Sequence, residues 1–133
     1  MSIPSIAFTL PDLHAGFTEM EGAVYLDAEF IVLNMNLPTL GGLRKKERII
    51  KIEPRALSSV SLLRGLAVDK ICLRPKKEDL LDAIPGKHLG EVQLRVWRTR
   101  RLDSKLFVQE VRRRMAMADA LEADNPITDE GSL

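Results

Sequence analysis

The stretch that decides the fold is residues 102–121, LDSKLFVQEVRRRMAMADAL, in which apolar side chains recur at spacings of three and four. This spacing predicts an amphipathic α-helix, because successive helical residues are about 100° apart and such positions share one face. The predicted apolar face consists of Phe107, Val108, Val111, Met115 and Ala118. Asp103 or Ser104 can cap the first turn, where backbone N–H groups lack partners. Arg114 lies nearest to the apolar face, so we expect its aliphatic stem to pack along the edge.

The sequence before this helix is rich in strand-forming residues separated by turn signals. Strands are predicted over residues 22–37 (two segments with a turn or bulge at Asp27 and Ala28), 45–53, 57–63, 68–73 and 91–98. The last run alternates most clearly, with Val92, Leu94 and Val96 on one side of the strand and Arg95 and Trp97 on the other. Consecutive strands with short loops favour an antiparallel meander, and a final helix can cover its open side. We therefore predict a mainly β protein with α: a small antiparallel barrel or sandwich of about seven strands, capped by the C-terminal helix.

The length of 133 residues fits one domain with its own core. Residues 1–21 contain Pro4 and Pro11 and are predicted to be an extended lead-in. Its apolar side chains, Ile6, Phe8, Leu10 and Leu13, are expected to dock on the core. The folded domain is predicted to cover residues 22–122, and residues 123–133 are predicted to form a flexible acidic tail.

The net charge of +1 conceals a strong segregation along the chain. Residues 1–43 and 115–133 each hold five acidic residues and no Lys or Arg, so all 20 basic residues lie between Arg44 and Arg114. With 19 − 10 = 9 acidic residues there, the central block carries 20 − 9 = +11 and each flank −5. The block is either a set of solvated strand and helix faces, or a basic surface for an anionic partner or for the protein's own acidic tail.

Catalytic and metal-binding patterns are sparse. His14 and His88 have no second ligand at a metal-binding spacing, and the serines at 58, 59 and 61 lack a nucleophile-elbow pattern. The single cysteine, Cys72, has no adjacent base and is predicted to be a small buried side chain. We therefore expect a non-catalytic protein with no cofactor and no metal site. The lack of a secretory signal and of a transmembrane segment favours a cytoplasmic location.

The order of these segments resembles the pleckstrin-homology-like superfold, in particular its small bacterial domains of uncharacterised function. The resemblance is carried by residues 22–37 and 44–52, by Leu62-Leu63-Arg64-Gly65, by residues 70–75, by Ile84-Pro85-Gly86 and by residues 92–96 leading into the helix. It implies a non-catalytic interaction or assembly module that binds a protein partner or associates with itself into an oligomer.

The alternative is the binding of an anionic ligand: an acidic lipid headgroup, a cyclic dinucleotide or nucleic acid. Arg44 to Arg48 matches the Arg-x-x-x-Arg motif of PilZ-type cyclic-dinucleotide barrels, although Gly65 falls one residue late for their second motif. The basic residues of the lipid-binding pleckstrin-homology pattern are missing from residues 23–37. The scarcity of aromatic residues argues against nucleic acid. The candidate ligand-binding residues are Arg44, Lys45, Lys46, Arg48, Arg95, Trp97, Arg98, Arg100 and Arg101.

Trp97 admits two interpretations. Its neighbours Arg95 and Arg98 favour an exposed indole that anchors a partner. The interpretation that we prefer from the sequence is that Trp97 closes one end of the core or lies under the N-terminal segment.

Overall fold

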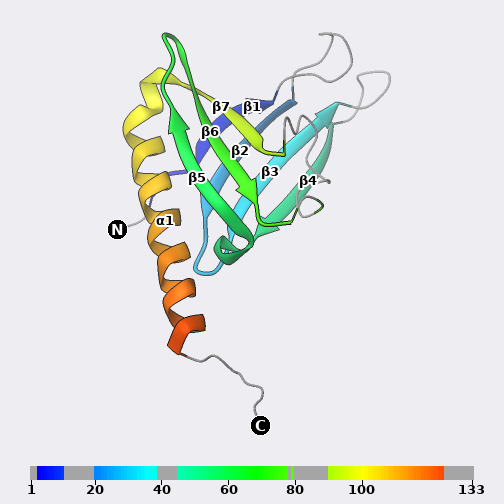
Figure 1. Cartoon of the computed structure of the whole chain (residues 1–133). Coiled ribbons are helices and arrows are strands. Elements are labelled where there is room, and N and C mark those ends of the chain that lie inside the picture. The colour runs from blue at the N-terminus through cyan, green and yellow to red at the C-terminus, as the bar shows by residue number, and fades with distance from the viewer. Residues whose placement is uncertain (1–2, 11–19, 39–44, 78, 80–89, 125–133) are drawn as a thin grey trace.

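The computed structural model describes residues 3–10, 20–38, 45–77, 79 and 90–124. Over these residues the chain forms one antiparallel sheet of seven strands, in the order β4-β3-β2-β1-β7-β6-β5, with one long helix at its C-terminal end (Figure 1). The elements are β1 (Ile6–Leu10), β2 (Met20–Leu26), β3 (Ile31–Pro38), β4 (Lys45–Ile52), η1 (Pro54–Ala56), β5 (Leu57–Leu63), β6 (Val68–Pro75), β7 (Val92–Trp97), η3 (Arg98–Arg100) and α1 (Arg101–Asp124). The predicted fold class is confirmed, and β4 and β5 form the two edges of the sheet.

Strand β1 lies at the centre of the sheet, although the sequence predicted only an extended lead-in there. It pairs with β2 from Ile6↔Val24 to Leu10↔Met20, and with β7 at Thr9↔Arg95. Its apolar residues dock on the core as expected, because Ile6, Phe8 and Leu10 alternate inward. Pro4 and Pro11 flank this five-residue alternation, and they favoured an extended lead-in at the level of the sequence. The predicted contact of Leu13 lies outside the described residues.

The predicted turn at Asp27 joins β2 to β3. The Asp27 carboxylate accepts hydrogen bonds from the backbone N–H groups of Glu29 and Phe30, and the Asp27 N–H donates to the Phe30 carbonyl at 3.0 Å. The Phe30 N–H is the main cause that lowers the pKa of Asp27, because it stabilises the ionised carboxylate. This side chain therefore closes the hairpin in the manner typical of Asp in turns.

The core lies between the concave face of the sheet and α1. Phe107, Val108 and Val111 are buried against the sheet, while Met115 and Ala118 are half-buried. The predicted helical face is thus confirmed over its first part and opens toward solvent further along. Full burial of a side chain such as Phe107 contributes about 2–3 kcal/mol. The helix packs mainly on β5 and η1.

Two arginines of the helix donate hydrogen bonds to backbone carbonyls of strand β5 and of the β2–β3 turn. Arg112 Nε donates to the carbonyl of Val60 at 3.0 Å, and Arg114 Nη1 donates to that of Asp27 at 2.7 Å. Arg114 is half-buried and lies at the border of the apolar face, as its position in the sequence predicted. These bonds fix the position of the helix beside the sheet.

The last turns of α1 extend beyond the end of the sheet (Figure 1). The helix continues to Asp124, so residues 123 and 124 of the predicted tail are helical, while residues 125–133 lie outside the described part. Among the described helices, none has the length and apolar character needed to cross a membrane.

Candidate functional site

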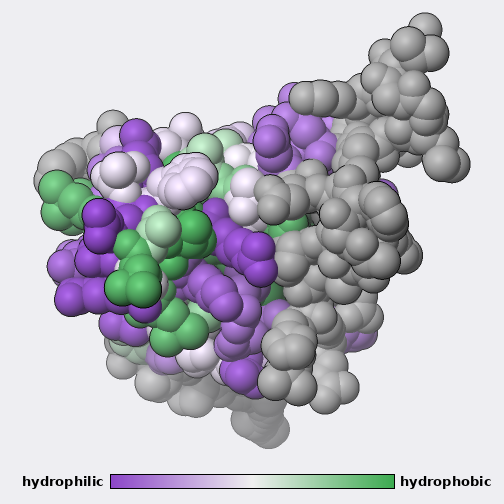
Figure 2. All heavy atoms as spheres, turned by 90° about the horizontal axis from the view of Figure 1, so that it is seen from above, coloured by the Kyte–Doolittle hydropathy of each residue, from purple (hydrophilic) through white to green (hydrophobic). Residues whose placement is uncertain are grey.

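A surface of mixed apolar and basic side chains covers the end of the molecule where the β5–β6 turn, the end of β7 and the start of α1 meet. We call it the apical patch. Strand pairing and the bond from the Arg98 N–H to the Ala67 carbonyl bring together Leu63, Arg64, Leu66, Val68, Lys70, Arg95, Trp97 and Arg98, and Leu102 follows in the first turn of α1. The large apolar members are unusually exposed: Leu66 is 92%, Leu102 70% and Trp97 64% accessible. The view of this end in Figure 2 shows hydrophobic and hydrophilic surfaces side by side. Clustered exposed apolar residues of this kind mark interaction surfaces.

Trp97 is exposed, which corrects the interpretation that we preferred from the sequence. Strand β7 alternates as predicted, with Val92, Leu94 and Val96 buried, so Trp97 at its end faces away from the core. It lies directly opposite Val68 of β6. The core on the other face of the sheet is filled without the indole, and the alternative interpretation of an exposed Trp beside arginines is confirmed.

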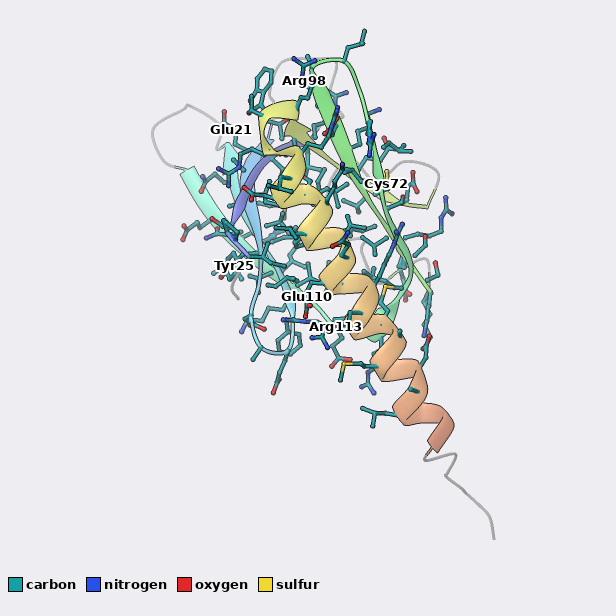
Figure 3. All side chains as sticks on the ribbon, turned by 90° about the vertical axis from the view of Figure 1, so that its left-hand side faces the viewer. Glu21, Tyr25, Cys72, Arg98, Glu110 and Arg113 are labelled. Atoms are coloured by element: carbon teal, nitrogen blue, oxygen red, sulfur yellow. The ribbon has the colours of Figure 1, made fainter. Side chains whose placement is uncertain are left out.

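A pocket of about 410 Å³ lies beside Trp97 on the same face of the sheet. Ala7, Phe8, Thr9, Glu21, Val68, Arg95, Val96 and Trp97 line it. Ala7, Phe8, Val68 and Val96 supply its apolar lining, and Glu21 and Arg95 are its charged residues. Figure 3 shows Glu21 and Arg98 toward the end of the molecule where α1 begins. The pocket can accept an aliphatic side chain of a partner, and Arg95 can pair with a carboxylate next to that side chain.

The basic residues of the patch include an unfavourable pair. Lys70 of β6 lies directly opposite Arg95 of β7 in the strand register, and like charges in this arrangement destabilise a sheet. Among the described residues, neither side chain makes an ion pair. Arg98 follows in η3, where its backbone N–H donates to the Ala67 carbonyl at 2.9 Å and its side chain is exposed. This concentration of positive charge suits an anionic or acidic partner.

An ion pair beneath the apical patch joins the β5–β6 turn to the start of α1. Asp69 is fully buried, and its carboxylate accepts hydrogen bonds from Arg101 at 2.8 and 2.9 Å and from the Gly65 N–H at 2.9 Å. The Arg101 hydrogen bonds are the main cause that lowers the pKa of Asp69 to about 2, and burial opposes them. Arg101 also donates to the Gly65 carbonyl at 3.1 Å, so the turn and the helix start are locked together.

Glycine is required in this turn by close packing. A Cβ atom at position 65 would lie 2.0 Å from the Val68 carbonyl oxygen, a distance that real Cβ atoms do not adopt. Gly65 therefore allows the tight β5–β6 turn that presents Leu66 to solvent.

The predicted ligand-binding residues fall into three groups. Arg95, Trp97 and Arg98 share the apical patch. Arg100 and Arg101 adjoin it but are engaged within the fold: Arg100 donates to the Ser5 carbonyl at 3.0 Å and pairs with Asp103 at 3.0 Å, and Arg101 pairs with Asp69. The other predicted residues, from Arg44 to Arg48, belong to a part of the sheet that several strands separate from the patch.

The third group is the cluster from Arg44 to Arg48. Arg44 lies outside the described residues, Lys45 and Lys46 belong to edge strand β4, and the Arg48 side chain is exposed. Strands β3, β2 and β1 separate β4 from β7, so the structure does not bring the two predicted clusters together.

A second exposed surface, which was not predicted from the sequence, lies at the far end of α1. Met117 and Leu121 are 51% and 61% accessible, and Asp119 is exposed between them. The groove beside them has a volume of about 420 Å³, and its apolar lining includes Phe30, Pro54 and Ala118. Their spacing of four residues was a usable signal, because it places them on one helical face outside the predicted core face. We call residues 115–124 the helix end.

Between these two surfaces, Glu110 joins two arginines of α1. It pairs with Arg114 at 3.0 Å and with Arg113 at 2.7 Å, and Figure 3 labels Glu110 and Arg113. The Arg113 hydrogen bond is the main cause that lowers the pKa of Glu110 to about 2. The Glu110 carboxylate thereby orders the arginines next to the Asp27 turn, and a groove of about 710 Å³ runs past them.

Cys72 is buried, as predicted, with 3% of its surface accessible. It lies outside the central core cluster, on the opposite face of the sheet, between Ser61 of β5 and Gln93 of β7. Burial is the main cause that raises the pKa of the thiol, which disfavours the thiolate needed of a nucleophile. His14 and His88 lie outside the described residues.

The apical patch thus combines an exposed indole, exposed leucines and positively charged side chains on one end of the molecule. Comparison with known protein families, with curated proteins and with solved structures finds no match for this chain.

Proposed function

We propose that this protein is a non-catalytic interaction module that binds a protein partner through the apical patch. The exposure of Trp97 among Leu66, Leu102 and basic side chains carries the proposal. Trp and Arg dominate the binding energy of protein interfaces, since they combine a large apolar area with directional polar contacts. The pleckstrin-homology-like resemblance belongs to this proposal, and the antiparallel strands followed by a C-terminal helix support it.

The support beneath the patch strengthens the proposal. The Asp69–Arg101 pair and the close packing at Gly65 hold the β5–β6 turn against the helix start. A surface fixed in this way loses little conformational entropy on association, and so more of its contact energy appears as affinity.

Site-specific photo-crosslinking in the native cell tests the proposal. A crosslinking amino acid at Leu66 should give a discrete protein adduct, and Trp97→Ser in the same chain should abolish it. The matched control places the crosslinker at Ser59, an exposed residue of β5 outside the patch, which should give no such adduct. An adduct at Leu66 that survives Trp97→Ser, or no adduct at all, would contradict the proposal.

A second function, the binding of an anionic ligand, is favoured by the Lys70–Arg95 juxtaposition. An anion between these side chains would relieve their repulsion. Binding to phosphatidylserine vesicles, a cyclic dinucleotide or single-stranded RNA should then weaken steeply with added salt and with Arg95→Gln. Lys51→Gln, an exposed change on β4, is the matched control and should leave binding unchanged. Absence of binding to all three probes would exclude this function.

A further inference from the structure

The two exposed apolar surfaces lie at opposite ends of α1 and carry opposite charge. The apical patch holds Arg64, Lys70, Arg95 and Arg98 around its leucines and Trp97. In the groove beside the helix end, Arg55 pairs with Glu53, and Arg113 and Arg114 pair with Glu110. The helix end itself contains no Lys or Arg, and Asp119 is exposed between Met117 and Leu121. The negative end of the helix dipole adds to this charge. Each surface therefore has the apolar character and the charge that the other would need in a partner.

A single copy cannot bring these two surfaces together. Helix α1 begins next to Trp97 and has 24 residues, which at 1.5 Å per residue corresponds to about 35 Å. Figure 1 shows the helix running straight from one end of the sheet to beyond the other. The helix end of one copy can therefore reach an apical patch only on a second copy.

The helix end matches the chemistry of the pocket beside Trp97. Met117 and Leu121 form a pair of apolar anchors on one helical face, typical of a helix that binds in a groove. The pocket has a volume of about 410 Å³, and of the two charged residues on its lining, Glu21 and Arg95, the arginine can pair with Asp119. Within one copy, Lys76 Nζ lies 3.9 Å from Asp119 Oδ1. Both side chains are exposed, so this ion pair competes only weakly with a pair between Arg95 and Asp119.

We propose that the protein assembles head to tail, with the helix end of one copy docked on the apical patch of the next. This inference rests on the proposed function and names its partner as a second copy of the chain. The two surfaces in such an interface differ, so the contact is heterologous, and it produces a ring where the rotation closes and an open chain where it does not.

Sedimentation velocity with light scattering tests the assembly on the purified full chain. The mass should rise above the 14.9 kDa of one chain with increasing concentration, and added salt should reduce it. Trp97→Ser and the double variant Met117→Ser/Leu121→Ser should each remain at the mass of one chain. Circular dichroism should show both variants folded, because all three side chains are exposed.

Mixing the two variants gives the sharpest result. Trp97→Ser keeps an intact helix end and the double variant keeps an intact patch, so together they should form a dimer of about 30 kDa, twice 14.9 kDa, that grows no further. A charge exchange refines the test: Arg95→Glu and Asp119→Arg should each weaken association about tenfold or more, and their mixture should regain it. Ile49→Ser, a change of similar exposure on β4, is the matched control and should leave the mass unchanged.

The outcomes separate this inference from the proposed function. A wild-type chain that stays a monomer at every concentration, or an assembly insensitive to Met117→Ser/Leu121→Ser, overturns head-to-tail assembly. The proposed function survives either result if the Leu66 adduct still depends on Trp97. If the adduct does not depend on Trp97, both proposals fail.

Discussion

The two ends of helix α1 have the same helical backbone but different surroundings. At its start, Arg101 is bound to buried Asp69 and Arg100 to the Ser5 carbonyl, so side chains and backbone of the sheet restrain it. At its far end, Met117 and Leu121 are exposed, and the helix extends beyond the sheet (Figure 1). The start of the helix is thus held by the sheet, whereas the exposed side chains of its end border an open groove. Local helical periodicity alone does not distinguish these roles.

The largest difference in the free energy of unfolding is expected when an apolar side chain is truncated in the packed part of α1 and at the exposed helix end. Phe107→Ala should lower the free energy of unfolding by about 3–5 kcal/mol, because it leaves a cavity in the core. Leu121→Ala at the exposed helix end should change it by about 0.5 kcal/mol or less. Urea denaturation of both variants measures the contrast. Equal losses of stability would show that the helix end is packed within a single copy.

A smaller contrast is expected between two aspartates. Asp69→Asn keeps the shape of the buried side chain but removes its charge-assisted bonds to Arg101, and should cost about 2 kcal/mol. Asp119→Asn at the exposed helix end should cost about 0.5 kcal/mol or less. Thermal unfolding at neutral pH compares them, and a nearly unchanged midpoint for Asp69→Asn would rule out the ion pair as the restraint on the helix start.

Acid should loosen the start of the helix through the same carboxylate. The pKa of Asp69 is about 2 in the folded chain against an ordinary value of 3.8, so its stabilisation is complete above about pH 5 and is lost progressively as the pH falls through 2. The loss is on the order of 2 kcal/mol, and Glu110, whose pKa is also about 2, adds to it. Urea titrations between pH 5 and 2 should show a shallower pH dependence for Asp69→Asn; superimposable profiles of variant and wild type would refute this assignment.

The smallest effect concerns Ser104, in the restrained part of the helix. Its hydroxyl is fully buried and has no hydrogen-bond partner among the described residues. Ser104→Ala should therefore raise the free energy of unfolding by about 0.5–1 kcal/mol, since it removes a desolvated polar group and improves helix propensity. Ser58→Ala, which removes an exposed bond to the Arg74 carbonyl, is the control and should not stabilise. A destabilised Ser104→Ala would indicate that the hydroxyl has a partner.

Much of the fold could be predicted from the pattern of apolar residues. The spacing of Phe107, Val108 and Val111 predicted the helix, and the alternation of Val92, Leu94 and Val96 predicted the inward face of β7. Both patterns depend only on the local geometry of one element. The strand at Ile6–Leu10 was missed because its five residues are stabilised by pairing with β2 and β7, which are distant in the sequence.

The candidate site was only partly predictable. Arg95, Trp97 and Arg98 stood out as a cluster because they are neighbours in the sequence. Leu66 joins them only through the pairing of β6 with β7, which places Val68 opposite Trp97. The engagement of Arg101 with Asp69 joins residues 32 positions apart. Neither contact leaves a local signal.

The sequence by itself determined the helix, the alternation of most strands and the segregation of charge, because each follows from the order of residues within one element or one segment. Only the tertiary structure decided which arginines are restrained, that Trp97 faces solvent, and that the basic and acidic apolar surfaces lie at opposite ends of α1. These features depend on strand register and on the packing of the helix across the sheet. Such packing is set by the combined burial of side chains from distant segments, and no local pattern contains it.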